Sequence, residues 1–470
     1  MNLRLFIFRA FVLLVCACLI GCSHFSPPPV PSIPGIAPPS EDEEVRISRE
    51  FRREAKKQLK FVNDPEVERY VENIGRRILS AIGPQPFDYR YFVIDQDVLN
   101  AFAVPGGTIY VYSGLLDRVR STDELAAVMA HETTHVFKRH MVRASGIDPV
   151  AILGLLGAVL AARSGAGSEA ALALGQGIAV TRQIAYTRQL ELEADTLGLK
   201  YMTAAGYDPR AMVSFQKVML QEQTLNPIDL PPYLLDHPLT QERISNAELL
   251  IRSLKPDESR ATSPDPIKKI KALLRIDKKE SDAVIAEQKK ILSESPKSSD
   301  AFQLLGLAYY SKAMWQEARK NLEQALTLNP RSPGIDRDLG RLYTQVGDFP
   351  AAHAAFDRAS TSEPKESLNY LYLGELFEKE GDLRSAAGAY LNAGNLSPLW
   401  DKPPQRLGNV YGKLDRMGDA YYYLGRALLL QDEDEQALAN FDRAIRALGP
   451  DSPRAQVIRE EIQVLRARRR

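Results

Sequence analysis

Residues 131–135 of the N-terminal half read His131-Glu132-Thr133-Thr134-His135. On a helix, two histidines four residues apart share a face about one turn apart, so one tetrahedral zinc ion can bind both imidazoles. Glu132 lies between them and is placed to act as the general base toward a water activated by the metal. The chain has only six histidines, and three of them fall within residues 131–140. The segment therefore predicts a zinc site rather than two unrelated surface histidines.

The residues before this segment predict where its helix begins. Ser121 and Thr122 are favourable N-cap residues, and Glu124 completes a capping box with Ser121. Apolar residues then recur at helical spacing. We expect a packed helix from near Thr122 to about Arg143, which would hold both histidines on a rigid element.

A zinc site of this kind needs a third protein ligand and an open position for water. Glu191 and Asp195 lie four residues apart in a predicted helix over about 170–204, so they share one face, while Glu193 points elsewhere. One of the pair can bind zinc, and the other can accept the remaining N–H of a histidine ligand. The spacing does not decide which residue does which, and a solvated acidic face is the alternative interpretation.

Four motifs, which follow one another along the chain in the expected order, resemble the HtpX-like and CAAX-prenyl-protease-like zinc metallopeptidases. They are the histidine segment, the Glu-x-x-Ala-Asp segment from Glu191, residues 100–116, and His237-Pro238 followed by Arg243. The resemblance covers about residues 45–255. It implies an α+β, zincin-like metallopeptidase domain, mostly helical with a small sheet, that holds one Zn²⁺ per chain.

The resemblance also implies a role for each matching residue. The implied zinc ligands are His131, His135 and Glu191; Glu132 is the catalytic base, Asp195 lies in the second shell, and His237 and Arg243 are catalytic groups near the metal. His237 is implied to stabilise the transition state or to act as a removable fourth ligand. The chain departs from its relatives at Thr133 and Thr134, which are not ligands, so the departure affects packing rather than metal binding.

Residues 101–104 and 108–112 flank a Pro-Gly-Gly turn and predict a β-hairpin. An edge strand beside the zinc of a metallopeptidase commonly binds substrate by strand addition. The candidate substrate-binding residues are therefore Ala103, Val104, Thr108, Ile109 and Tyr110. The apolar segment 149–162 is too short for a membrane span, and its composition fits either a buried core helix or a mobile lid.

The N-terminus has the features of a bacterial lipoprotein signal. A basic start and a short apolar run end at Leu19-Ile20-Gly21-Cys22, which resembles a lipobox, so we expect Cys22 to be lipidated. Residues 26–40 contain seven prolines and predict an extended tether. Ser23 after the cysteine favours the periplasmic face of the outer membrane.

The C-terminal half repeats with a period of 34 residues. A Leu-Gly pair recurs at Leu305, Leu339, Leu373 and Leu407, and alanines and prolines recur in the same period. This period and these residues resemble tetratricopeptide repeats, which stack pairs of helices into an all-α solenoid. The register restarts half a repeat later at Leu424, so we expect one shared helix. Either a partner-binding surface or a purely structural scaffold fits the pattern.

The predicted order is a signal peptide (1–21), a Pro-rich tether (22–44), a metallopeptidase domain (45–258), a linker with a degenerate helical repeat (259–297), repeats (298–450) and a capping helix (451–470). Lysine plus arginine and aspartate plus glutamate both number 60, which argues against a nucleic-acid surface. The order resembles the periplasmic BepA-type proteases. It implies cleavage of unfolded or misassembled envelope proteins, with repeats that bind the outer-membrane assembly machinery. The alternative is a chaperone or adaptor whose zinc site is largely self-inhibited.

Overall fold

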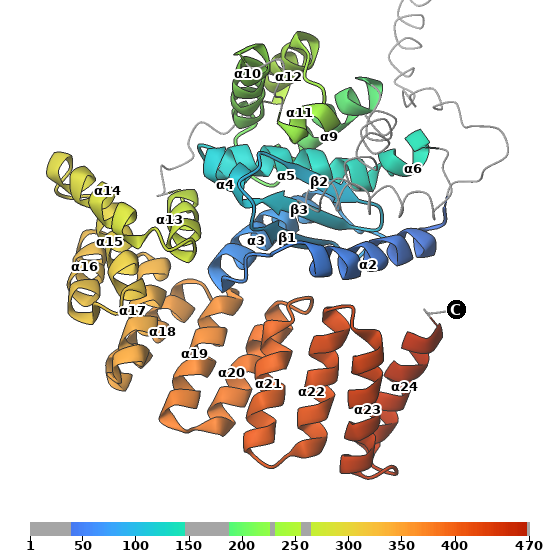
Figure 1. Cartoon of the computed structure of the whole chain (residues 1–470), viewed down its shortest axis with the longest axis vertical. Coiled ribbons are helices and arrows are strands. Elements are labelled where there is room, and N and C mark those ends of the chain that lie inside the picture. Colours follow the sequence, from blue (N-terminus) through green and yellow to red (C-terminus); the bar gives the residue numbers. More distant parts are fainter. Residues whose placement is uncertain (1–38, 146–187, 226–230, 255–264, 468–470) are drawn as a thin grey trace, which may run out of the picture. The chain divides into compact units, whose positions relative to one another are not determined.

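The computed structural model of the protein describes residues 39–145, 188–225, 231–254 and 265–467 (Figure 1). The expected lipidation site Cys22, the signal peptide, most of the tether and the segment 149–162 lie outside these residues. Among the helices that are described, none is both long and apolar enough to cross a membrane. The described chain is mostly helical with one three-stranded sheet, as the sequence predicts.

The N-terminal half begins with two helices that flank the sheet region. Its elements are α2 (Glu41–Gln58), α3 (Pro65–Ile82), β1 (Arg90–Ile94), β2 (Ala101–Val104), β3 (Thr108–Tyr112), α4 (Ser113–Arg118), α5 (Thr122–Phe137), α6 (His140–Ser145), α9 (Arg188–Ala204), α10 (Arg210–Leu225), α11 (Pro232–Asp236) and α12 (Gln241–Leu254). Asp64 caps α3, and Ser121 caps α5 as predicted. Helix α2 already begins at Glu41, inside the expected tether, because Ser40 and Glu43 form a capping box.

The predicted hairpin is confirmed, but only one of its two strands, β2, lies at an edge of the sheet. Strand β3 lies in the centre of the sheet, parallel to β1 and antiparallel to β2. The backbone of Thr108, Ile109 and Tyr110 is therefore paired on both sides, and these residues do not form an edge. The edge-strand argument applies only to Ala103 and Val104, which lie on the outer strand β2.

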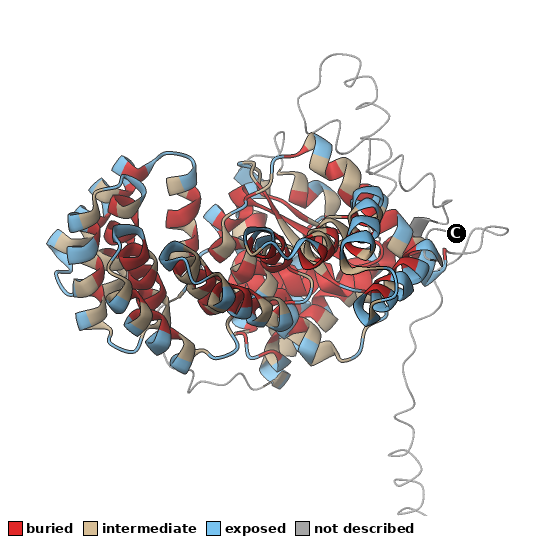
Figure 2. Ribbon diagram, turned by 90° about the horizontal axis from the view of Figure 1, so that it is seen from below, coloured by how far each residue is buried: buried red, intermediate tan, exposed pale blue. Residues whose placement is uncertain are grey.

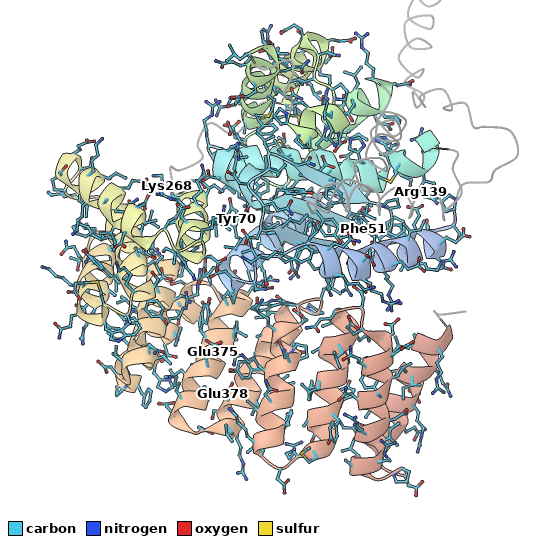
Figure 3. The ribbon with its side chains drawn as sticks, viewed as in Figure 1. Phe51, Tyr70, Arg139, Lys268, Glu375 and Glu378 are labelled. Atoms are coloured by element: carbon cyan, nitrogen blue, oxygen red, sulfur yellow. The ribbon has the colours of Figure 1, made fainter. Side chains whose placement is uncertain are left out.

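The helix that carries both histidines is shorter than predicted. Helix α5 ends at Phe137 rather than near Arg143, and α6 begins at His140 after a turn. Arg139 in this turn has a φ of 54°, a left-handed conformation that a continuous helix does not contain. The side chain of Arg139 pairs with Glu44 of α2 (Figure 3), which stabilises the break.

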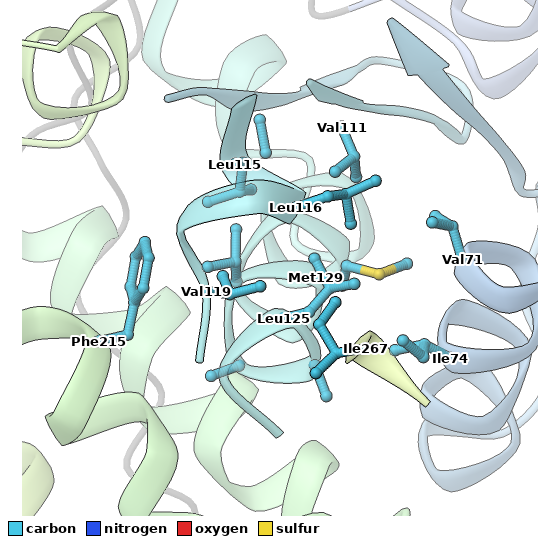
Figure 4. Close-up of a cluster of buried hydrophobic side chains, with 14 of the residues drawn as sticks. Val71, Ile74, Val111, Leu115, Leu116, Val119, Leu125, Met129, Phe215 and Ile267 are labelled. Carbon is cyan, nitrogen blue, oxygen red and sulfur yellow. The ribbon is translucent and has the colours of Figure 1, made fainter. Parts of the chain in front are cut away.

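The core of the N-terminal half packs between the sheet, α3 and α5. Figure 4 shows Leu116 and Met129 in this cluster, with Val71 of α3 beside them. Ile267 of helix α13 (Ile267–Asp277) belongs to the same cluster and is only 1% exposed. Residues 259–297, expected to be a linker with a degenerate repeat, thus include one helix that completes this core and a second, α14 (Ser281–Glu294).

The C-terminal half is an array of antiparallel helix pairs (Figure 1). The helices are α15 (Ser299–Ser311), α16 (Trp315–Leu328), α17 (Pro333–Val346), α18 (Phe349–Ser362), α19 (Ser367–Glu380), α20 (Leu383–Leu396), α21 (Lys402–Lys413), α22 (Met417–Leu430), α23 (Asp434–Leu448) and α24 (Pro453–Ala467). Helix α22 packs against both α21 and α23, which matches the shared helix predicted from the change of register. Buried residues line the inner faces of the pairs (Figure 2).

The recurring Leu-Gly pairs have a packing cause. A Cβ atom added at Gly340 would lie 2.6 Å from the ring of Phe356, and one added at Gly374 would lie 2.5 Å from the ring of Tyr390. Real Cβ contacts are not this short, so only glycine lets the two helices of a pair approach this closely. The same close approach recurs where the register restarts, between Gly425 and Phe441.

Buried ion pairs connect α2 of the N-terminal half to the loop before α23. Arg52 donates from Nε and Nη2 to the two carboxylate oxygens of Asp432, at 2.7 Å each. Arg52 is 5% exposed and Asp432 is 1% exposed. The same guanidinium donates to Thr108 at the start of β3. Arg52 therefore connects the repeats to the central strand of the sheet.

We expect Asp432→Ala to lower the free energy of unfolding by about 3–5 kcal/mol, because it leaves the buried Arg52 guanidinium without its carboxylate. Arg319→Ala is the control, since Arg319 and its partner Glu323 are both about half exposed, and it should change stability by less than about 0.5 kcal/mol. Chemical denaturation of both full-length variants provides the measurement. Equal stabilities would show that the buried pair contributes nothing.

Candidate metal centre

Helices α5 and α9 bring the predicted ligands together. His131, His135, Glu191 and His237 each offer one ligand atom, and these atoms lie within 4.8 Å of one another. Nε2 of His135 lies 2.9 Å from Nε2 of His131 and 3.3 Å from Oε1 of Glu191. All four side chains are buried. The one-turn spacing on α5 therefore directs both imidazoles at the carboxylate of α9, as the sequence predicts.

Asp195 and Arg243 lie behind this cluster. Nδ1 of His131 is 2.9 Å from Oδ1 of Asp195, so His131 presents its Nε2 to the cluster. Arg243 donates from Nε and Nη2 to the two oxygens of Asp195, at 2.6 and 2.9 Å. Its Nη1 also lies 2.7 Å from Oε2 of Glu191. One buried guanidinium thus holds both acidic residues of α9 in place.

The cluster contains more buried negative charge than positive charge. Among the described residues, Arg243 is the one guanidinium that pairs with Glu191 and Asp195, whereas Glu132 faces His237. With neutral histidines, the formal charge is about two negative units, and uncompensated buried charge is costly. A divalent cation would supply the missing positive charge.

The pKa values show the same imbalance. Burial lowers the pKa of His131, but the carboxylates of Glu191 and Asp195 outweigh burial and raise it to about 10. Burial raises the pKa of Glu191, yet His237 and Arg243 hold it well below its usual range. The site therefore attracts positive charge, either as protons or as a metal ion.

Glu132 and His237 lie beside the three predicted ligands, and both side chains are buried. Burial raises the pKa of Glu132, although His237 and His131 oppose the shift. Nε2 of His237 lies 3.3 Å from Oε1 of Glu132, and its Nδ1 lies 3.0 Å from Oε1 of Glu191. Tyr233 packs against the His237 ring, with a centroid distance of 5.0 Å. His237 thus occupies the position where a fourth ligand or a reacting group would be.

The predicted substrate-binding residues fall into two groups. Ala103 and Val104 line a small pocket together with His135 and Arg139, so they lie beside the ligand set. Thr108, Ile109 and Tyr110 do not line this pocket. Sequence reasoning also missed His140, whose ring contacts that of His135. The only signal for it was the third histidine in the stretch 131–140.

The donor set fits zinc. Three imidazole nitrogens and one carboxylate oxygen converge in a buried site, and these are ligand types that zinc takes in tetrahedral coordination. No sulfur ligand is among them. Asp195 accepts a hydrogen bond from Nδ1 of His131, a contact that fixes the tautomer of a histidine whose Nε2 binds a metal.

Comparison with known proteins agrees with this geometry. The family described as peptidase family M48 matches residues 65–251, which contain the whole ligand set. Residues 65–251 are a peptidase family M48 domain. Tetratricopeptide repeat families match residues 311–374 and 409–453, within the helical array that follows the M48 domain.

Several curated proteins resemble the part of the chain that contains the M48 domain. The beta-barrel assembly-enhancing protease of Escherichia coli is 32% identical over 221 residues, covering 46% of this chain and 45% of the relative. A putative beta-barrel assembly-enhancing protease of Vibrio cholerae is 32% identical over 247 residues, covering 51% of each. The mitochondrial metalloendopeptidase OMA1 of Schizosaccharomyces pombe is 34% identical over 143 residues, covering 30% of this chain and 41% of the relative. The matches span about half the length of these relatives or less.

We expect Glu191→Gln to weaken zinc binding by more than about 100-fold, which exceeds the loss typical of second-shell changes. The amide keeps the shape of the side chain but loses the charge that attracts the metal. Glu248→Gln is the control, because Glu248 is an exposed acidic residue on α12 that pairs with Lys217. Zinc content by mass spectrometry and competition with a chelator give the measurement. Full zinc content in Glu191→Gln would exclude Glu191 as a ligand.

Proposed function

We propose that the protein is a zinc-dependent endopeptidase in which His131, His135 and Glu191 bind the metal. The observation that carries this proposal is the buried convergence of these three residues inside an M48 domain. Zinc, when bound, supplies Lewis-acid polarisation of the scissile carbonyl and lowers the pKa of a water molecule. The protein residues then orient the substrate and move the protons.

Glu132 is the proposed general base. It accepts the proton of the attacking water and passes it to the leaving amine. Its buried position supports this role, because burial raises the pKa of the carboxyl toward the working pH of a base. Asp195 and Arg243 are proposed to hold His131 and Glu191 rather than to touch the substrate, since their contacts lie behind the ligands.

The outer strand β2 is the proposed substrate strand. A peptide that adds to the edge at Ala103 and Val104 would run beside His135, because these residues line one pocket. In strand addition, most of the affinity comes from hydrogen bonds to the peptide backbone rather than from side chains. This mode of binding suits unfolded protein substrates, whose backbone is exposed.

We expect Glu132→Gln to lower the rate of peptide cleavage by about 10²–10⁴-fold, the range for loss of a general base. The amide has nearly the same shape but cannot accept the proton, and the three ligands are unchanged. Zinc content, measured on the same sample, should stay at one ion per chain. Cleavage at the normal rate by this variant would contradict the proposed mechanism.

Misassembled β-barrel proteins of the bacterial outer membrane are the proposed substrates. Support comes from the relatives that are named beta-barrel assembly-enhancing proteases. The tetratricopeptide array supports a second element of the proposal, that the repeats bind a partner in outer-membrane assembly. The direct experiment adds an unfolded β-barrel protein to the zinc-loaded protein and follows its fragments. Cleavage of this substrate but not of its folded form supports the proposal.

We further propose that the protein is anchored by lipid on Cys22 to the periplasmic face of the outer membrane, on the strength of the lipobox-like segment that ends there. Mass spectrometry of the mature N-terminus should show an acylated Cys22, and Cys22→Ala should abolish that mass shift. Several acyl chains are needed for stable anchoring. A mature wild-type chain that begins at another residue, without acyl groups, would contradict this proposal.

A chaperone or adaptor with a self-inhibited zinc site is the second candidate function. The specific observation that favours it is the position of His237, which contacts both Glu132 and Glu191. A resting site closed by this imidazole would bind unfolded β-barrel proteins without cutting them. In the same experiment, suppressed aggregation without fragments would favour this second function.

A further inference from the structure

A second series of polar groups extends from His135 toward the surface, on the side of its ring that faces away from the ligand cluster. Nδ1 of His140 lies 3.0 Å from Nδ1 of His135. Nε2 of His140 lies 3.2 Å from Oε2 of Glu193, which also pairs with Lys138 at 2.8 Å. The His140 side chain has no exposed surface.

The proton positions in this series follow from the ligand role of His135. When Nε2 of His135 faces the metal, its Nδ1 carries the proton. Nδ1 of His140 must then accept that proton, so the proton of a neutral His140 is on Nε2. This N–H points at the Glu193 carboxylate, and every group has the partner that it needs. His140 is therefore neutral, because only one proton can lie between the two Nδ1 atoms and it belongs to His135.

The break between α5 and α6 makes the contact possible. In a continuous helix, residues five apart point to different faces, since 3.6 residues complete one turn. His140 would then point away from His135. The left-handed turn at Arg139 instead returns the chain so that the two rings lie 4.9 Å apart, edge to face.

We propose that His140 is a positioning residue of the metal centre, which fixes the tautomer and the ring plane of His135 and is itself held by Glu193. This inference rests on the proposed zinc site. The two histidine ligands then have different hydrogen-bond partners on their Nδ1 atoms. His131 is held by a charged carboxylate, whereas His135 is held by a neutral imidazole. Second-shell partners of this kind typically contribute 10- to 100-fold to metal affinity.

The test compares substitutions of His140 in the full-length protein. His140→Leu has a similar volume but no acceptor, so it should weaken zinc binding by about 10- to 100-fold in chelator competition. His140→Asn places an amide oxygen near the position of Nδ1 and should restore most of the affinity. The unfolding midpoint of each metal-free variant, measured alongside, separates a loss of zinc affinity from a loss of stability, because His140→Leu also leaves the buried N–H of His135 without its acceptor. His353→Leu, at a partly exposed histidine of the repeats, is the control and should bind zinc normally.

A spectroscopic readout accompanies the affinity. The cobalt-loaded protein should show a changed visible spectrum in His140→Leu and a nearly normal one in His140→Asn, because the orientation of His135 sets the ligand field. If His140→Leu does not fold, His140→Gln replaces it. Glutamine is polar but extends past the Nδ1 position, so it should weaken binding while His140→Asn does not.

The outcomes separate this inference from the proposed function. Wild-type protein that binds no zinc would refute the zinc site itself. Zinc binding by wild type that His140→Leu leaves unchanged would overturn only the positioning role. Equal losses of affinity in the asparagine variant and in the leucine or glutamine variant would also overturn it, because the acceptor at Nδ1 would then not matter.

Discussion

The arrangement of the N-terminal half depends on an excess of buried negative charge. Glu132, Glu191 and Asp195 are all buried around the same histidines, and among the described residues Arg243 is the one guanidinium that pairs with any of them, namely with Glu191 and Asp195. Such a group is stable only if additional positive charge enters it. The histidines of α5 provide sites for that charge, as protons or as ligands to a cation. The packing of α5 against α9 therefore buries negative charge that a divalent metal ion would neutralise.

Much of this fold follows from local signals in the sequence. The caps of α3 and α5, the hairpin around residues 105–107 and the Leu-Gly pairs of the repeats depend on neighbouring residues or on a fixed period, and all are found in the structure. The convergence of His131, His135 and Glu191 was also predictable. The spacing on two helices brings one of Glu191 and Asp195 to the histidines, and the resemblance to known peptidases implies that it is Glu191. Local signals of this kind need no knowledge of distant contacts.

Other features depend on contacts between distant segments, and the sequence did not reveal them. Helix α5 ends at Phe137 because Arg139 turns the chain and pairs with Glu44, which lies 95 residues earlier. Strand β3 is central because β1 adds to it in parallel, a pairing that a hairpin pattern does not predict. Nothing in the sequence around Arg52 indicates that its side chain pairs with Asp432, which lies 380 residues later. In each case a partner far along the chain decides the role.

X-ray absorption at the zinc edge, measured on purified full-length protein, tests the central claim most directly, because it reports which atoms surround the metal. We expect one zinc per chain in a four-coordinate shell of nitrogen and oxygen at about 2.0–2.1 Å, with outer-shell scattering from imidazole rings. A six-coordinate oxygen shell without imidazole scattering would contradict it, as would protein that holds no zinc after purification in zinc-containing buffer.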